Sequence, residues 1–144
     1  MIEIKATPEP LQVALSDEDL FCMAAVIYNE AGGNGCTDEH REMVAYVVLN
    51  RVNDPRFPDT IRGVLEAPGQ YAGMENGVKF ASRHTSPGEQ KAVARAFRIA
   101  QRVLENQYDI PIPENVVFQA EFEQGIGTYK QLGNTYFCYA SEVN

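Results

Sequence analysis

One carboxylate stands out as a candidate catalytic group: Glu30, near the end of a predicted helix that Gly32 and Gly33 terminate. It follows Val26 by four residues and Ile27 by three, so it shares their apolar stripe. A carboxyl group there loses water and lies at the negative end of the helix dipole, and both effects favour its protonated form. A glutamic acid that keeps its proton near neutral pH can act as a general acid. By itself, this spacing is more typical of a surface glutamate that merely ends a helix than of a catalytic acid.

Other catalytic chemistries lack their residues in this chain. There are two histidines, His40 and His84, and no CxxC or HExxH pattern, so we expect no zinc and no other cofactor. No GxSxG turn holds a nucleophilic serine, and a His84–Cys138 pair would depend on a tertiary contact. The glycines of segment 32–35 follow a predicted helix, whereas a phosphate-binding loop precedes one.

Glycoside cleavage is a reaction that one protonated carboxyl group can begin. Glycosidases usually add a second group as base or nucleophile. Glu66 and Glu75 are the candidates for that second group, and a solvated surface role suits both better. If Glu30 works alone, the substrate must supply its own nucleophile, as muramic acid can through its C6 hydroxyl.

The composition describes one acidic globular domain of 144 residues, with 44% hydrophobic and 22% charged residues. Its net charge of −8 argues against a nucleic-acid partner, which requires clustered lysine and arginine. No apolar run has the length that spans a bilayer. Residues 1–12 lack the pattern of a secretion signal, so either the chain is made without one or the signal is not part of this sequence. Localisation and oligomeric state stay open.

Three cysteines cannot all pair within one chain. We expect Cys22, Cys36 and Cys138 to be free thiols in buried or partly buried positions. A Cys22–Cys36 disulfide is the alternative, and no feature of the sequence supports it.

The elements that would position Glu30 form a mainly helical α+β domain over residues 16–144, preceded by an extended arm over residues 1–15. Capping residues and apolar periodicity predict four helices. They cover residues 16–31, 37–52, 60–66 and 86–106, with Ser16, Thr37, Thr60 and Ser86 as N-caps and an irregular segment over Gln70–Arg83. The β-prone runs Val116–Phe118 and Thr135–Tyr139 predict a small β-hairpin beside the helices.

Four segments in order resemble the SleB/CwlJ-type cell wall hydrolases, which include spore-cortex-lytic enzymes and their phage and vegetative relatives. They are Val26–Ala31, Val47–Val52, Asp54–Val64 and Pro68–Tyr71, followed by Leu132–Phe137, which resembles the closing motif. The resemblance implies a lysozyme-like fold and cleavage of the peptidoglycan glycan strand. Most members are regarded as lytic transglycosylases that break the bond between N-acetylmuramic acid and N-acetylglucosamine.

The resemblance places the family's catalytic glutamate on Glu30. Gln70 and Tyr71 fall on a Gln–Phe motif beside the cleft, with Tyr71 in place of the phenylalanine and expected to keep an aromatic face for a sugar. Asn134 and Tyr136 fall on the closing motif and are expected to line the same cleft. A frequent histidine of that motif is Thr135 here, so any role of the histidine is lost or not needed.

Other residues near these motifs have a structural alternative. Phe118 and Gln119 either line the sugar groove, since aromatic faces stack on sugar rings, or pack the hairpin. Asn50 and Arg51 end a buried helix, so we expect them to make structural hydrogen bonds. Phe57 lies between two prolines, and we expect its side chain to fill a space in the core.

Three functions therefore stay open: a lytic transglycosylase, a muramidase that uses water as nucleophile, and a non-catalytic protein of the cell wall or spore coat. An amidase is disfavoured because the zinc ligands are missing. Peptidoglycan glycan strands are the expected partner.

Overall fold

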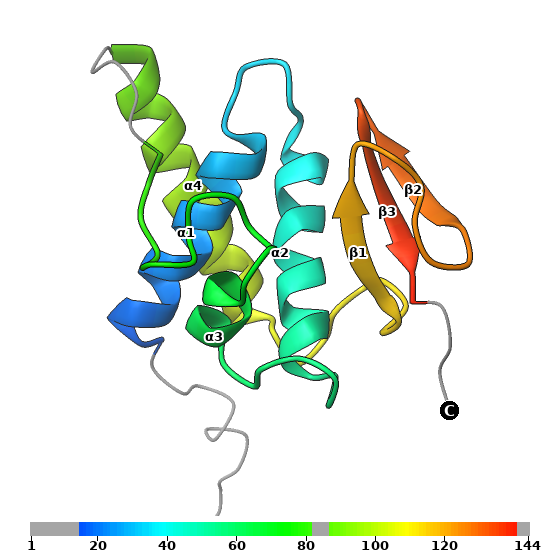
Figure 1. Ribbon diagram of the computed structural model, residues 1–144. Coiled ribbons are helices and arrows are strands. Elements are labelled where there is room, and N and C mark those ends of the chain that lie inside the picture. The colour runs from blue at the N-terminus through cyan, green and yellow to red at the C-terminus, as the bar shows by residue number, and fades with distance from the viewer. Residues whose placement is uncertain (1–14, 82–86, 141–144) are drawn as a thin grey trace, which may run out of the picture.

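A computed structural model describes residues 15–81 and 87–140 as four helices and a three-stranded antiparallel sheet (Figure 1). The helices are α1 (Asp17–Ala31), α2 (Asp38–Val52), α3 (Ile61–Glu66) and α4 (Pro87–Glu105). The strands are β1 (Val116–Ala120), β2 (Thr128–Leu132) and β3 (Thr135–Tyr139). The prediction of a mainly helical, lysozyme-like α+β domain is confirmed. Outside the described residues lie positions 1–14 of the predicted arm over residues 1–15, the predicted cap Ser86, and His84.

Three of the predicted helix caps are present. The side-chain oxygens of Ser16, Thr37 and Thr60 each accept a hydrogen bond from a backbone N–H three residues later, which satisfies donors that the helix itself leaves unpaired. These local bonds begin α1, α2 and α3 where the sequence predicts.

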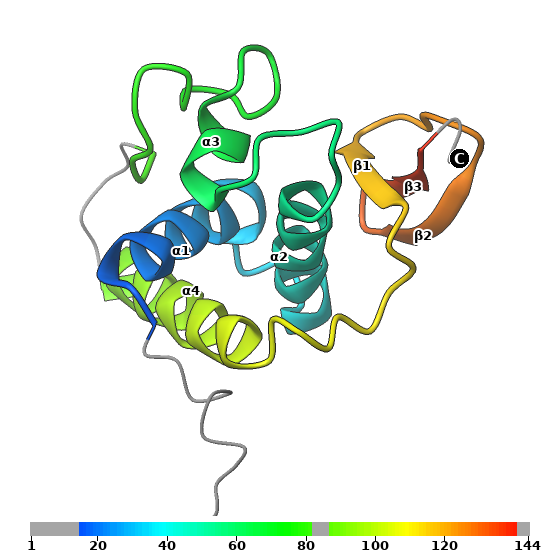
Figure 2. The same cartoon turned by 90° about the horizontal axis from the view of Figure 1, so that it is seen from below.

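Helix α2 is the central element of the domain. It packs against α1, α3 and α4 on one side and against β1 on the other, and both views place it between the helices and the sheet (Figures 1 and 2). Val44, Val47 and Val48 have no exposed surface. Because neighbours surround α2, its sequence is apolar almost all round, as expected of a helix buried on most sides.

The sheet has the strand order β1-β3-β2. The two predicted strands do pair, β1 antiparallel to β3, but the expectation of a single hairpin was incomplete. Strand β2 was missed because its sequence, Thr128–Leu132, is polar and half exposed, as an edge strand can be. It joins β3 through a tight turn at Gly133 and Asn134, where Gly133 has φ +58°.

Three smaller features of the sequence can be located in the described residues. Cys22, Cys36 and Cys138 are unpaired, and two of them are buried. In the described part of the chain, no helix combines the length and apolar character needed to cross a membrane. The segment after α3 stays irregular as far as Ala81.

Candidate active site

The C-terminal end of α1 carries Glu30 and is held by two arginines from other helices. Arg41 of α2 is 3% exposed, and its Nε donates to the carbonyl oxygen of Ala31 at 2.8 Å. Its Nη2 donates to the carbonyl oxygens of Gly33 and Cys36 at 2.8 and 2.9 Å. In α4, Arg95 donates from Nη2 to the Gly32 carbonyl oxygen at 2.8 Å.

These arginines change one expectation about Glu30. Their guanidinium groups bind carbonyl oxygens at the end of α1, so their positive charge offsets the negative end of the helix dipole. The pKa of Glu30 is nevertheless raised, first because the surrounding protein displaces part of the water around the carboxyl group and second because Glu121 places a negative charge nearby. The effect of burial on the pKa of Glu30 is therefore as predicted. The second contribution to the raised pKa comes from the charge of Glu121 rather than from the helix dipole.

Glu30 combines this crowding with access to solvent. The side chain is exposed, and its Oε1 accepts a hydrogen bond from Nε2 of Gln119 at 3.4 Å. The oxygen of the same Gln119 amide is buried and has no hydrogen-bond partner within the described ranges. A carboxyl group that resists ionisation and still faces solvent can give a proton to a bound substrate.

A second cluster of side chains gathers around Arg51 at the end of α2. Arg51 is buried, donates from Nε to the Val117 carbonyl oxygen at 2.7 Å, and donates from Nη1 to Oε1 of Gln70 at 3.0 Å. Its guanidinium carbon lies 5.0 Å from the ring centre of Phe57 and 5.3 Å from that of Tyr71. The expected structural hydrogen bonds of Arg51 are present, and they connect it to two predicted site residues.

Tyr71 differs from its predicted role. The residue is 3% exposed and belongs to the core, so its ring does not offer a face to a sugar. Its hydroxyl is buried without a hydrogen-bond partner among the residues described. The charge of Glu30 acts on this hydroxyl, because it contributes to the raised pKa of Tyr71 after the larger effect of burial. Gln70, by contrast, is exposed.

Pairing in the sheet separates the other predicted residues. Residues paired across antiparallel strands share a face, and neighbours along a strand alternate. Gln119 pairs with the buried Phe137, whereas Phe118 pairs with Cys138 and Ala120 pairs with Tyr136. Gln119 thus faces Glu30, whereas Phe118 and Tyr136 occupy the opposite face of the sheet; Asn134 is exposed in the β2–β3 turn. Phe118 and Tyr136 therefore lie on the face away from Gln119, and Asn134 makes no hydrogen bond to Glu30 within the described residues.

Two features near Glu30 escaped the sequence analysis. Asn29 fastens the irregular segment to α1, since its Nδ2 donates to the Lys79 carbonyl oxygen at 3.0 Å and its Oδ1 accepts from the Ala81 N–H at 2.7 Å. Glu121 follows β1 and acts on Glu30 by its charge. Side chains two residues apart in a strand point to the same face. Extending the predicted strand beyond Gln119 would therefore have placed Glu121 on the face of Gln119.

The carboxylates that the sequence suggested as second groups have structural partners instead. Glu66 accepts a hydrogen bond from Nη1 of Arg62 at 3.0 Å, and Glu75 accepts one from the N–H of Gly69. Both roles agree with the surface interpretation.

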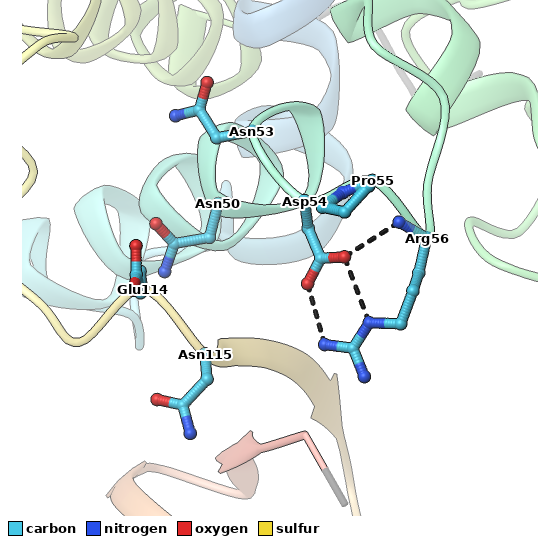
Figure 3. A pocket seen from close by; sticks show the side chains of 7 residues that line it. All are labelled: Asn50, Asn53, Asp54, Pro55, Arg56, Glu114 and Asn115. Atoms are coloured by element: carbon cyan, nitrogen blue, oxygen red, sulfur yellow. Dashed lines mark hydrogen bonds and ion pairs between the residues drawn. The ribbon is translucent and has the colours of Figure 1, made fainter. Parts of the chain in front are cut away.

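A polar pocket of about 170 Å³ lies away from Glu30, where α2 ends and β1 begins (Figure 3). Asn50, Asp54, Arg56 and Asn115 are among its lining residues. Arg56 donates to Asp54, from Nε to Oδ1 at 3.0 Å and from Nη2 to Oδ2 at 2.7 Å. This pairing lowers the pKa of Asp54, so the pocket holds an ionised carboxylate rather than a proton donor. The described residues form no cluster of His, Cys, Asp or Glu suited to a metal.

Comparisons with known proteins match the sequence of this chain to one group. The profile of a family described as Cell Wall Hydrolase matches residues 35–138. Spore cortex-lytic enzymes of Halalkalibacterium halodurans, Oceanobacillus iheyensis and Bacillus subtilis are 38%, 39% and 34% identical over 73, 62 and 62 residues. These matches cover 51%, 43% and 43% of this chain and 21%, 22% and 20% of the relatives, so the chain spans about a fifth of their length. No solved structure matches the chain significantly.

Proposed function

Because the chain belongs to the Cell Wall Hydrolase family, we propose that it cleaves the glycan strand of peptidoglycan and that Glu30 is its catalytic acid. The family profile begins at residue 35, five residues after Glu30. The assignment of Glu30 therefore depends on its motif and its surroundings. The spore cortex-lytic enzymes among the relatives make cortex peptidoglycan a natural substrate to test beside vegetative wall.

One observation carries the proposal: Glu30 has a raised pKa while its side chain remains open to solvent. A glycosidic oxygen is a poor leaving group until it is protonated, and an acid is effective when its pKa lies near the working pH. Asp54, the carboxylate of the polar pocket, has the opposite shift. Of these two carboxylates, Glu30 is the one whose surroundings favour the protonated form.

In the proposed reaction, Glu30 gives its proton to the oxygen of the bond between N-acetylmuramic acid and N-acetylglucosamine. The C–O bond breaks, its electron pair stays on that oxygen, and an oxocarbenium-like sugar remains. Glu30, now a carboxylate, takes the proton of the C6 hydroxyl while the C6 oxygen bonds to the anomeric carbon. The products are a 1,6-anhydro end and a regenerated acid, as in a lytic transglycosylase.

Glu121 supports a second candidate, a muramidase that uses water. Its charge reaches Glu30, and a carboxylate near the acid is the group that an inverting or retaining glycosidase uses as base or nucleophile. In that reaction the new end is reducing. Gln70, exposed and held by Arg51, and Gln119, bonded to Glu30, are the predicted binding residues best placed to orient either substrate.

Digestion of purified cortex and vegetative walls by the parent and by Glu30→Gln tests the proposal. Glutamine keeps the shape of the side chain and cannot donate the proton, so fragment release falls by at least about 100-fold, the typical share of a general acid. Mass spectrometry of the released muropeptides then separates anhydro ends from reducing ends. Fragment release by Glu30→Gln at the parental rate would remove Glu30 from the mechanism. Binding to sacculi by the parent without any release would indicate a non-catalytic wall protein.

A further inference from the structure

The amide of Gln119 joins the candidate acid to the first strand of the sheet. Its Nε2 donates to Oε1 of Glu30 at 3.4 Å, and this contact is exposed to solvent. Its own oxygen is buried and has no hydrogen-bond partner in residues 15–81 and 87–140. A sugar hydroxyl cannot donate to an oxygen that solvent does not reach. The oxygen of Gln119 therefore does not bind a sugar, and the amide contacts the acid instead.

The backbone that carries Gln119 is held on two sides. Gln119 pairs with Phe137 of β3, a residue with no exposed surface. Two residues earlier in β1, the carbonyl oxygen of Val117 accepts a hydrogen bond from Nε of Arg51 in α2 at 2.7 Å. Strand β1 thus lies between α2 and β3 (Figure 1). Gln119 therefore reaches Glu30 from a fixed point of the fold.

The surroundings of Gln119 also favour one orientation of its amide. The amide nitrogen carries two N–H donors, whereas the amide oxygen carries acceptor sites alone. Turning the amide over would bury both donors in the place where one oxygen is now buried. In folded proteins, buried N–H groups without a partner are rarer than C=O groups that lack one. The orientation with Nε2 toward Glu30 is therefore the favoured one.

This contact makes the two oxygens of Glu30 unequal. Oε1 accepts the N–H of Gln119, and in a carboxylic acid the oxygen without the proton is the better acceptor. Oε2 makes no hydrogen bond within the described part of the chain, and the side chain is exposed. In the acid form of Glu30, the proton therefore lies on Oε2, the oxygen that is open to a substrate.

We propose that Gln119 is a positioning residue, whose N–H keeps Oε1 of Glu30 as the acceptor and leaves Oε2 to carry the proton to the glycosidic oxygen. This inference rests on the proposed function of Glu30. In the reaction, the O–H bond of Oε2 breaks, its electron pair stays on Oε2, and the proton goes to the glycosidic oxygen. Oε2 then takes the proton of the C6 hydroxyl, or of water in a muramidase. Gln119 orients the acid rather than the sugar.

The same N–H stabilises Glu30 after it has lost its proton. A hydrogen bond to a carboxylate is roughly twice as strong as one between neutral groups. The contact of 3.4 Å is long, as hydrogen bonds of catalytic groups often are without substrate, and such bonds shorten in the reactive complex. The bond from Gln119 is therefore worth most when Glu30 is ionised and the reaction is half complete.

Gln119→Met tests this role, because methionine has a similar length and no amide. Gln131→Met in β2 is the matched control, since the Gln131 amide donates to the Gly133 carbonyl oxygen at 3.2 Å rather than to Glu30. Both changes leave the other charged and titratable groups around the acid in place. These are Glu121 after β1, Arg41 of α2, Arg95 of α4 and Tyr71 of the irregular segment.

The direct readout is the titration of Glu30, followed by carbon-13 NMR of side-chain carboxyl groups and assigned with Glu30→Gln. Loss of the donor destabilises the carboxylate, so the pKa of Glu30 rises by at least about half a unit in Gln119→Met. It stays at the parental value in Gln131→Met. On cell walls, kcat of Gln119→Met falls about tenfold while KM stays within about twofold of the parent.

Two results would overturn the proposal. One is a parental titration of Glu30 in Gln119→Met. The other is a higher KM at the parental kcat, which is the signature of a residue that binds the substrate.

Gln119→Glu is a second variant, which keeps the shape of the side chain and places an oxygen where the N–H was. The pKa of Glu30 should then rise further than in Gln119→Met, because a like charge replaces the donor. A pKa of Glu30 no higher than the parental value in Gln119→Glu contradicts the contact. These titrations report on the contact whether or not Glu30 is the catalytic acid. The activity of Glu30→Gln tests that separate point.

Discussion

Arg41 holds the helix end on which Glu30 stands, and its removal gives the prediction that the structure specifies most fully. In Arg41→Met, three carbonyl oxygens lose the hydrogen bond from the guanidinium group, those of Ala31, Gly33 and Cys36. The Gly33 oxygen keeps a bond from the Cys36 N–H at 3.1 Å. The bond to Ala31 is buried, and the other two are partly buried. We assign about 2 kcal/mol to the buried carbonyl, which gains no water in exchange, and about 1 kcal/mol to each of the others.

The expected loss in the free energy of unfolding is therefore about 4 kcal/mol. The ion pair of Arg41 with Asp38 adds less than about 1 kcal/mol, because the Asp38 side chain is 53% exposed. For a domain of this size, about 4 kcal/mol lowers Tm by about 8–16 °C. Arg41→Lys recovers less than half of the loss, since one ammonium group cannot serve three separated carbonyls.

Urea titration at neutral pH, followed by circular dichroism in the helix band, measures the loss. Arg98→Met on the exposed face of α4 is the control, since Arg98 is exposed and has no partner in the described residues, and it stays within about 0.5 kcal/mol of the parent. If Arg41→Met lost less than about 1 kcal/mol, the carbonyls at the end of α1 would have other partners. The account of how this helix end is held would then be wrong.

Three further predictions concern the charge on Glu30 and the backbone of the sheet. Glu121→Gln removes a negative charge that raises the pKa of Glu30, so the alkaline limb of the pH profile of activity moves to lower pH. An alkaline limb at the parental pH would contradict the effect of the Glu121 charge on Glu30. Because the folded-state pKa of Glu30 is raised, the stability from this group is full below the unfolded pKa and is lost as pH rises through the folded value. Glu30→Gln, which never ionises, should therefore raise Tm at neutral pH and leave it unchanged at about pH 4, near the ordinary pKa of glutamate; an equal Tm at neutral pH would argue against the shift. Gly125→Ala places a Cβ 1.8 Å from the carbonyl oxygen of Tyr139 at φ +60° and should sharply lower Tm, whereas Gly33→Ala meets no atom within 4 Å and should not.

Helix positions were predictable because their signals act within a few residues. Ser16, Thr37 and Thr60 each cap a helix through a bond that spans three residues. The polar strand β2 gave no comparable signal, since an edge strand takes its order from the strand it pairs with rather than from its own sequence.

The site was predictable in part, for a related reason. Its place in the helix and its motif both indicated Glu30 as the candidate acid. The predicted burial was enough to give the direction in which its pKa shifts. Aromatic residues were harder to assign: Tyr71 lies inside the core, and Phe118 and Tyr136 lie on the face of the sheet away from Gln119. A single sequence shows residue types, whereas access to a substrate depends on what covers each side chain.

The sequence by itself determined that α1 ends on a glutamate and two glycines, that α2 is apolar almost all round, and that the chain carries a net negative charge. Only the tertiary structure decided which groups surround the acid. Gln119 is 89 residues from Glu30 along the chain, and Arg51 reaches Val117 where the pairing of β1 with β3 is irregular. Caps and periodicity follow from the energies of neighbouring residues, but the proton affinity of Glu30 depends on water and charge. Folding alone brings Gln119 and Glu121 to that carboxyl group and displaces part of its water.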